Sequence, residues 1–205
     1  MDLYNKYILP NAINWACNQK PTMLQRQKVI PLAEGTVLEV GIGSGLNLPF
    51  YNKEHISHLL AIDPSEALWK KNKVDLKSLG FNFEFAKALA EDIPADNNSF
   101  DTVILTYTLC SIRETQVALE EIRRVLKRNG KLLFCEHGKA PDMAIQKWQN
   151  RMNPLWKRVG GGCNLNKDIP ALINGNGFKI NNLDTMYIPG WKPASFNYWG
   201  AAEIK

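Results

Sequence analysis

The segment Leu38-Glu39-Val40-Gly41-Ile42-Gly43-Ser44-Gly45 is a short apolar strand that runs directly into three glycines at alternate positions. Its apolar residues are branched or aliphatic, as is typical of a buried strand. Glycine permits a tight turn with positive φ, and its missing Cβ lets a ligand approach the backbone. A strand, such a turn and then a helix place ligands at the carboxyl edge of a parallel sheet.

A second apolar strand, expected over residues 57–63, ends in the carboxylate of Asp63. A carboxylate at this position can accept hydrogen bonds from both ribose hydroxyls, so dinucleotides and S-adenosylmethionine both fit. The dinucleotide fingerprint requires glycine where this chain has Leu46. The acid Glu39 would repel a pyrophosphate but suits the ammonium of a methionyl group. These two residues favour S-adenosylmethionine.

Glu39–Gly45 resembles motif I of the class I S-adenosylmethionine-dependent methyltransferases, and Asp63 resembles the acidic residue after their second strand. The resemblance continues through residues 90–94, 98–101 and 121–130, where it is similar to the ubiquinone and menaquinone type. It implies a Rossmann-like α/β fold: a seven-stranded, mostly parallel sheet with an antiparallel last strand and helices on both faces.

The same resemblance implies S-adenosyl-L-methionine as cofactor and a set of residues that bind it. The loop after the third strand contacts adenine in the family, often through an acid, but this chain has Leu89 at the usual polar position. Glu91 or Asp92 could replace that acid, or backbone groups could serve alone. The expected cofactor-binding residues are Glu39, Gly41, Gly43, Gly45, Asn47, Asp63, Pro64, Ala90, Glu91, Thr106 and Cys110.

Other elements follow from periodicity and from turn residues. One long helix is expected to begin near Glu114 and to carry Lys127 and Arg128 in its last turn, before an Asn129-Gly130 cap. The amides at the start of a helix over residues 46–51 could hold the methionyl carboxylate. Further helices are expected over 1–30, over 65–79 and from 168, and strands over 81–85, 100–106, 131–137, from 177 and over 196–204.

Residues 139–165 form an insertion with Trp148, Pro154-x-Trp156 and a glycine-rich run that continues to Asn166. This pattern is similar to a branch that contains small bacterial phospholipid N-methyltransferases and mammalian thiol S-methyltransferases. The resemblance implies that the insertion covers the substrate, and we expect it to form the acceptor pocket with the N-terminal helical cap over residues 1–30. The tryptophans would supply apolar area for a lipophilic acceptor.

Methyl transfer from a sulfonium is a direct displacement, so the protein mainly aligns the reactants and excludes water. Tyr4, Tyr7 and Tyr107 could steady the sulfonium through cation–π attraction. His137 is the candidate general base, because its reference pKa lies near neutrality. Its alternative role is a strand-end histidine bonded to backbone. Cys163, in the glycine-rich run, is a further catalytic candidate, with a plain loop residue as the alternative.

The chain has 205 residues, which predicts a single domain, and a net charge of +5 that is scattered, not clustered. Neither a nucleic-acid site nor a secretory signal is expected. The four cysteines form no CxxC pair and the three histidines show no ligand spacing, so no metal site is expected. Reduced thiols fit a cytoplasmic enzyme.

These observations predict a methyltransferase acting on a small or lipophilic acceptor: a phospholipid amine, a thiol or a quinone-like ring. Peripheral membrane contact is compatible with the charge, and the oligomeric state is left open. The two alternative functions are a nicotinamide-dependent oxidoreductase, which Leu46 disfavours, and a non-catalytic module that retains the cofactor fold.

Overall fold

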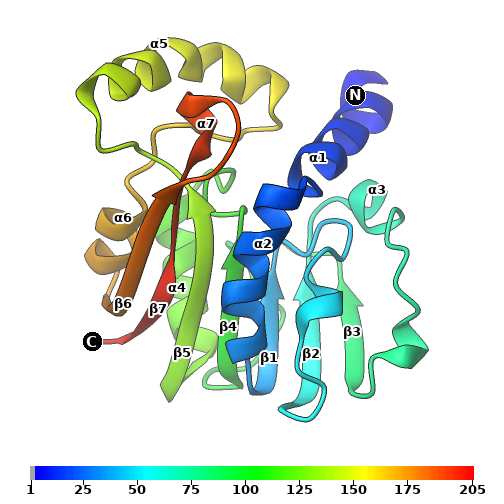
Figure 1. Cartoon of the computed structure of the whole chain (residues 1–205). Helices are drawn as coiled ribbons and strands as arrows, with labels where there is room; N and C mark the ends of the chain where they lie inside the picture. The colour runs from blue at the N-terminus through cyan, green and yellow to red at the C-terminus, as the bar shows by residue number, and fades with distance from the viewer. Residues whose placement is uncertain (1–2) are drawn as a thin grey trace.

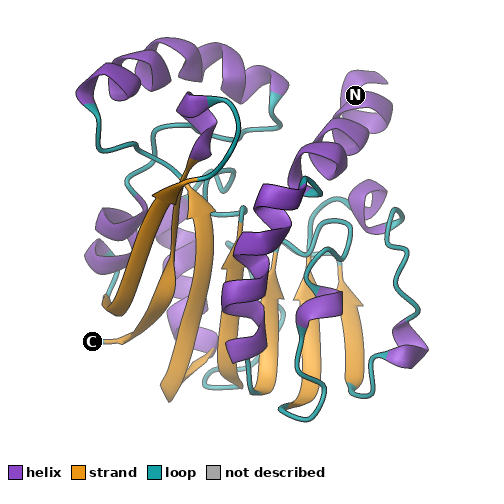
Figure 2. Cartoon of the chain, in the orientation of Figure 1, coloured by secondary structure: helices purple, strands orange, loops and turns teal. Residues whose placement is uncertain are grey.

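A computed structural model describes residues 3–205, in which seven strands form one sheet flanked by helices (Figures 1 and 2). The strand order is β3-β2-β1-β4-β5-β7-β6, and β7 runs antiparallel to the other six strands. The Rossmann-like sheet with an antiparallel last strand is thereby confirmed. The strands are β1 (Gly35–Val40), β2 (Ile56–Ile62), β3 (Asn82–Ala86), β4 (Phe100–Thr106), β5 (Leu126–His137), β6 (Phe178–Tyr187) and β7 (Phe196–Ile204).

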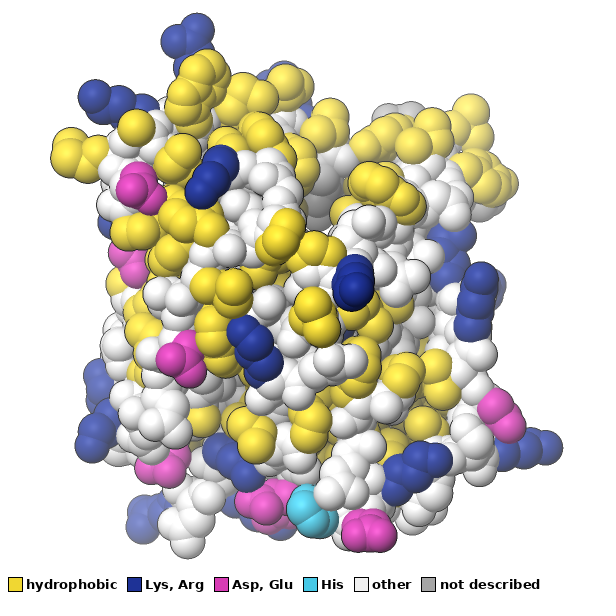
Figure 3. All heavy atoms as spheres, in the orientation of Figure 1, with side chains coloured by type: hydrophobic (Ala, Val, Ile, Leu, Met, Phe, Trp, Pro, Cys, Tyr) yellow, Lys and Arg dark blue, Asp and Glu magenta, His cyan; other side chains and the backbone are white. Residues whose placement is uncertain are grey.

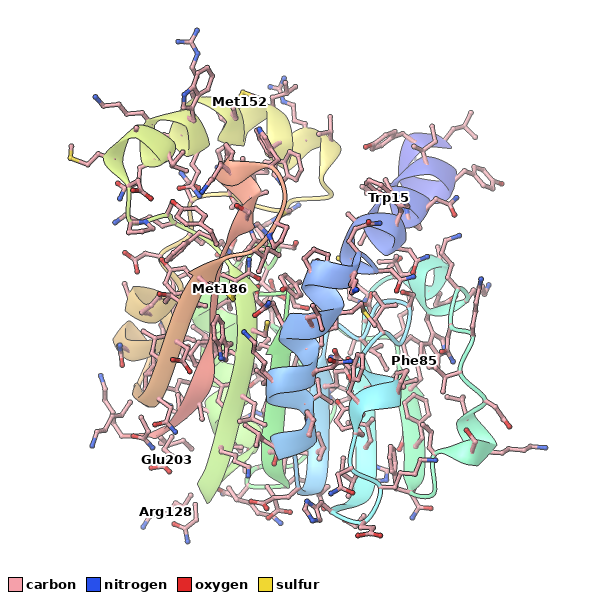
Figure 4. All side chains as sticks on the ribbon, in the orientation of Figure 1. Trp15, Phe85, Arg128, Met152, Met186 and Glu203 are labelled. Atoms are coloured by element: carbon pink, nitrogen blue, oxygen red, sulfur yellow. The ribbon has the colours of Figure 1, made fainter. Side chains whose placement is uncertain are left out.

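The sheet register brings three loops to one point. Val40, the last residue of β1, lies opposite Ile62 of β2 and Leu105 of β4. The strand order reverses between β1 and β4, which is where open α/β sheets bind ligands. This is the upper edge in Figure 4, where Trp15 and Met152 are labelled; Arg128 and Glu203 lie at the opposite end.

Helices cover both faces of the sheet and leave a hydrophobic cluster on each (Figure 1). On one face α4 packs its fully buried residues Ala118, Leu119, Ile122 and Val125 at the three- and four-residue spacing of an amphipathic helix. On the other face lies the end of α2. The helices are α1 (Leu9–Cys17), α2 (Lys20–Val29), α3 (Glu66–Trp69), α4 (Thr115–Val125), α5 (Met143–Val159), α6 (Ile169–Gly175) and α7 (Lys192–Ser195), with single turns at Tyr4–Ile8, Ile30–Leu32, Leu48–Phe50 and Leu76–Ser78.

The prediction of a helix over residues 46–51, after the glycine turn, is wrong. Only one 3-10 turn, Leu48–Phe50, forms there, because Tyr51 leaves the helical region to bury its hydroxyl against Glu39. The helix expected over residues 65–79 is also interrupted. It stops after Trp69, and the Asn72 side chain accepts a hydrogen bond from the amide of Val74, which favours a turn over a helix.

The expected cap at Asn129-Gly130 is wrong too, because α4 ends at Val125 and β5 begins at Leu126. Lys127 extends its amine to Asp101 of the neighbouring strand, at 2.8 Å, instead of toward the helix end. Within residues 3–205, no helix combines the length and the apolar character needed to cross a bilayer.

Gly200 in β7 provides a test of the sheet register. It pairs with both β5 and β6, and a Cβ at this position would collide with the backbone carbonyl oxygen of Asn182. Gly200→Ala should lower the free energy of unfolding by about 2 kcal/mol or more, measured by urea denaturation. Gly175→Ala is the matched control, since its Cβ would meet nothing within 4 Å. Equal stabilities for the two variants would contradict the register.

Candidate functional site

A cavity of about 1180 Å³ opens at the carboxyl edge of the sheet. Its floor is formed by the loops after β1, β2 and β4, and its walls include α1 and the segment after α5. Figure 3 shows the upper surface indented between the side chains over α5 and those over the N-terminal helices. Eight of the expected site residues line it: Gly41, Gly43, Asp63, Pro64, Ala90, Glu91, Thr106 and Tyr107.

The three glycines of the turn serve different purposes. All have positive φ, at +78° for Gly41, +57° for Gly43 and +76° for Gly45. A side chain on Gly41 would collide with Thr108, and one on Gly45 would lie 2.7 Å from Asn72. A Cβ on Gly43 would meet nothing within 4 Å. Gly43 therefore leaves open space over the turn, which suits close approach of a ligand to the backbone.

Asp63 is held firmly at the cavity wall. Its Oδ2 accepts a hydrogen bond from the amide of Gly43 at 2.8 Å, and its Oδ1 accepts one from Ser65 at 2.7 Å. Each carboxylate oxygen retains acceptor capacity, so the group can still receive two hydroxyls. Burial raises the pKa of this carboxyl, and the two amide hydrogen bonds oppose that shift. The geometry fits the ribose contact expected from the sequence.

Glu39 lies behind the cavity and does not line it. Its carboxylate accepts hydrogen bonds from the hydroxyl of Tyr51 at 2.6 Å and from the amide of Asn47 at 2.9 Å. Asn47 in turn accepts a hydrogen bond from Arg26 at 2.7 Å. The Glu39 carboxylate is therefore not exposed to the cavity, where a direct contact with the methionyl ammonium was expected. It instead holds the side chains of Tyr51 and Asn47 in the floor.

Arg26 is a cavity residue that sequence reasoning missed. It lies on α2, and its Nη1 also donates to Thr106 Oγ1, 80 positions away, at 2.8 Å. Its Nε has no hydrogen-bond partner among the described residues. A guanidinium binds carboxylates well. Because the expected helix over 46–51 does not form, Arg26 is the better candidate to hold the methionyl carboxylate. No local motif marks it.

Tyr107 lines the cavity, and its backbone has an unusual φ of +54°. Its hydroxyl donates to Asn197 at 2.6 Å, and the guanidinium of Arg26 lies 5.1 Å from the ring centre. Burial raises the pKa of the hydroxyl well above its ordinary value, so Tyr107 is not a base near neutral pH. Tyr4 and Tyr7 lie outside the described lining of the cavity.

Beside the loop after β3, the cavity is lined by apolar side chains and by the charged residues Glu91, Arg113 and Glu114. Leu68, Leu89 and Ile112 line the cavity, and Leu89 keeps 53% of its surface exposed. Glu91 also lines it and accepts a hydrogen bond from the amide of Glu114 at 3.2 Å. Of the two acids that could replace the polar residue at position 89, Glu91 is therefore the one at the cavity.

The other expected catalytic residues lie together behind the cavity wall. His137 Nε2 is 3.1 Å from Cys163 Sγ, which is 3.6 Å from the sulfur of Cys110. None of the three lines the cavity, and neither do Gly45 and Asn47. The role of His137 as a general base stays a prediction, without a direct path from its ring into the cavity.

Trp148 and Trp156 do not line this cavity, and their contribution to an acceptor pocket stays a prediction. Trp148 is 57% exposed on α5, and Trp156 packs on Trp191 with ring centres 5.3 Å apart. The indole of Trp156 also lies beside the glycine-rich loop, where a Cβ added to Gly160 would be 3.3 Å from its nitrogen. The apolar wall comes instead from α1, through Leu9 and Ile13.

Glu39 makes the stability of the ligand-free protein depend on pH. Burial raises its pKa to about 7 from an ordinary 4.5, so the fold favours the protonated form. The contribution of Glu39 to the free energy of unfolding should decline as pH rises from about 4.5 through 7, by roughly 3 kcal/mol in total. Glu39→Gln should show a decline in unfolding free energy that is shallower by about that amount, measured by urea denaturation from pH 5 to 8.

The exposed Glu203→Gln is the matched control and should follow the wild-type profile. A residual decline is expected in Glu39→Gln, because burial also raises the pKa of Asp63 and Glu136. Identical pH profiles for wild type and Glu39→Gln would contradict this account, because they would show that folding does not raise the pKa of Glu39.

Comparison with known proteins identifies the family. The profile described as "Methyltransferase domain" matches residues 38–134. Human thiol S-methyltransferase TMT1A is 32% identical over 84% of this chain and 72% of its own length. Rat thiol S-methyltransferase TMT1B is 31% identical over 80% of this chain and 66% of its own length. This chain thus spans about two thirds of these relatives.

A demethylmenaquinone methyltransferase from Clavibacter sepedonicus is 31% identical over 55% of this chain and 45% of its own length. The crystal structure of an S-adenosylmethionine-dependent methyltransferase from Thermotoga maritima, a possible histamine N-methyltransferase, superimposes with a TM-score of 0.67 at 19% identity, covering 98% of this chain and 97% of that one. The superposition on the Thermotoga maritima protein shows a shared fold. The expectations of family and cofactor are confirmed: the chain belongs to the class I S-adenosylmethionine-dependent methyltransferases, and its cofactor is S-adenosylmethionine.

Proposed function

We propose that the chain transfers the methyl group of S-adenosylmethionine to the sulfur of a small apolar thiol. The similarity to the two thiol S-methyltransferases extends over 80–84% of the chain, well beyond residues 38–134. The similarity to the quinone-type relative covers 55%. An alignment over 84% of the chain must reach the segment after α5, which lines the cavity, and this supports a thiol over a quinone-like ring.

The distribution of charge around the cavity is the observation that carries the proposal. The carboxylates that line it, Asp63, Glu91 and Glu114, follow β2 and β3 or precede α4. One cationic side chain that lines it, Arg113, adjoins Glu114 before α4. Three come from other elements and form a cationic wall: Arg26 from α2, Lys157 from the end of α5, and Lys167 from the loop before α6.

This cationic wall favours an anionic nucleophile. A thiol has an ordinary pKa of about 8.5, and nearby positive charges favour the thiolate. A phospholipid amine is an ammonium near neutral pH and would be repelled by the same charges. A thiol therefore needs no side-chain base in the cavity, which agrees with the position of His137 behind the wall.

The remaining wall of the acceptor end is apolar and close-fitting. Leu9 and Ile13 of α1 face Gly161, where an added Cβ would lie 3.0 Å from Leu9 and 3.4 Å from Ile13. Ser44 donates to Asn14 at 2.6 Å and ties α1 to the glycine turn. These contacts support the proposal that α1 and the segment after α5 enclose the acceptor and exclude water.

In this proposal the cofactor supplies an activated methyl group, and the chain supplies orientation. Asp63 would hold the ribose, Arg26 the methionyl carboxylate, and Gly43 the space between them. Tyr107 would present its ring to the reacting groups. The peripheral membrane contact and cytoplasmic location expected from the sequence stay predictions; α5 exposes Trp148 and Leu155 beside basic side chains, which is compatible with a membrane surface.

The acceptor is tested by offering the purified chain labelled S-adenosylmethionine with three acceptors: thiophenol, phosphatidylethanolamine vesicles and a methylatable hydroquinone. We expect label on the thiol, at a rate that rises with pH as the thiol ionises. Lys157→Gln should lower kcat/KM for the thiol by about threefold, since a solvent-accessible charge contributes up to roughly 1 kcal/mol. Lys147→Gln, on the same helix but outside the cavity lining, is the matched control.

Methylation of the lipid or the hydroquinone without the thiol would overturn the proposed acceptor. Cofactor binding with no transfer to any of the three would instead favour the non-catalytic module. An equal effect of Lys157→Gln and Lys147→Gln on kcat/KM would contradict the claim that positive charge at the cavity favours the thiolate.

A further inference from the structure

Two cysteines and a histidine from distant parts of the chain meet next to the cavity. Cys110 lies in the loop after β4, His137 ends β5, and Cys163 follows the glycines after α5. Their ligand atoms all lie within 4.8 Å of one another. The side chains of Cys110 and His137 are buried, and that of Cys163 is half-buried. The sequence separations of 26 and 53 residues explain why no ligand spacing was visible.

The distances in this cluster resemble those between ligands of a tetrahedral metal site. Zinc bonds of about 2.3 Å to sulfur and about 2.0 Å to nitrogen, at tetrahedral angles, separate two sulfurs by about 3.8 Å and sulfur from nitrogen by about 3.5 Å. Here the two sulfurs are 3.6 Å apart, and His137 Nε2 is 3.1 Å from Cys163 Sγ. Shifts of a few tenths of an ångström would accommodate the ion.

We propose that Cys110, His137 and Cys163 bind one zinc ion. On binding, the two thiols would each lose a proton to solvent, and two thiolates would neutralise the charge of the ion. Soft thiolates with an imidazole select zinc over magnesium or calcium. His137 Nδ1 is buried without a hydrogen-bond partner among residues 3–205, and Nε2 is the ring atom that faces the thiols.

The ion would fix the wall of the acceptor end. The residues adjacent to the ligands in the sequence, Ser111, Gly162 and Asn164, line the cavity. Asn164 already anchors the glycine-rich loop, since its backbone and side-chain nitrogens both donate to the carbonyl of Cys110, at 3.0 and 2.9 Å. A zinc ion shared by Cys163, Cys110 and His137 would add a stronger restraint at the same place. The inference does not depend on which acceptor is used.

The test measures metal binding by the full chain, purified under reducing conditions, stripped with a chelator and then incubated with zinc. We expect it to retain one equivalent of zinc after gel filtration. Cobalt should give the intense visible bands of a tetrahedral site with thiolate ligands, and zinc should abolish them. Cys163→Ser and His137→Gln should each weaken zinc binding by about 100-fold or more. Cys135→Ala is the matched control: it removes a buried thiol outside the cluster and should leave the stoichiometry unchanged.

Binding of S-adenosylhomocysteine by each variant shows that it is folded, so loss of zinc reports the ligand and not unfolding. Three results would overturn the site: no zinc retained and no cobalt bands, full zinc retention by Cys163→Ser, or equal zinc loss in Cys135→Ala. A disulfide between Cys110 and Cys163 that forms in the presence of excess zinc would also overturn it, and would identify the cluster as a redox pair.

Discussion

The buried hydrogen-bond network that begins at Arg26 is the constraint on which the site depends. Arg26 bonds Asn47 and Thr106, and Asn47 bonds Glu39, which also receives the hydroxyl of Tyr51. These contacts join α2, β4, β1 and the segment after the glycine turn directly beneath the cavity. A buried charge that loses its partners costs several kcal/mol, so the network holds the floor in one arrangement.

The network also explains how a cationic wall and an acidic floor coexist. Asn47 separates the guanidinium from the Glu39 carboxylate, so neither charge is fully cancelled by the other. Burial raises the pKa of the Glu39 carboxyl and favours its protonated form, although Arg26 and the hydrogen bonds oppose that shift. A bound carboxylate would meet the charge of Arg26 with no compensating acid in contact with it. The assignment of Arg26 to the methionyl carboxylate rests on this arrangement.

The sequence predicted the sheet well because strand periodicity and the glycine turn are local signals. β4 and β7 have the expected bounds, and Gly43 and Asp63 meet as the parallel register requires. Errors arose where side chains from distant segments override local preference: Tyr51 turns toward Glu39, and Lys127 toward Asp101. Arg26 and the Cys110–His137–Cys163 cluster were missed for the same reason, since only the fold brings their partners together. That Trp148 and Trp156 do not line the cavity could not be predicted either, because aromatic content does not fix where a side chain packs.

The central claim is that Asp63, beside Gly43, holds the cofactor ribose. Calorimetry of S-adenosylhomocysteine binding to wild type, Asp63→Ala and the exposed control Asp184→Ala tests it most directly. We predict micromolar affinity for wild type and control, about −8 kcal/mol, and a loss of roughly 2 kcal/mol for Asp63→Ala, because two hydroxyls would be left unpaired in a partly buried site. An unchanged affinity in Asp63→Ala would contradict the account and place the ribose elsewhere in the cavity.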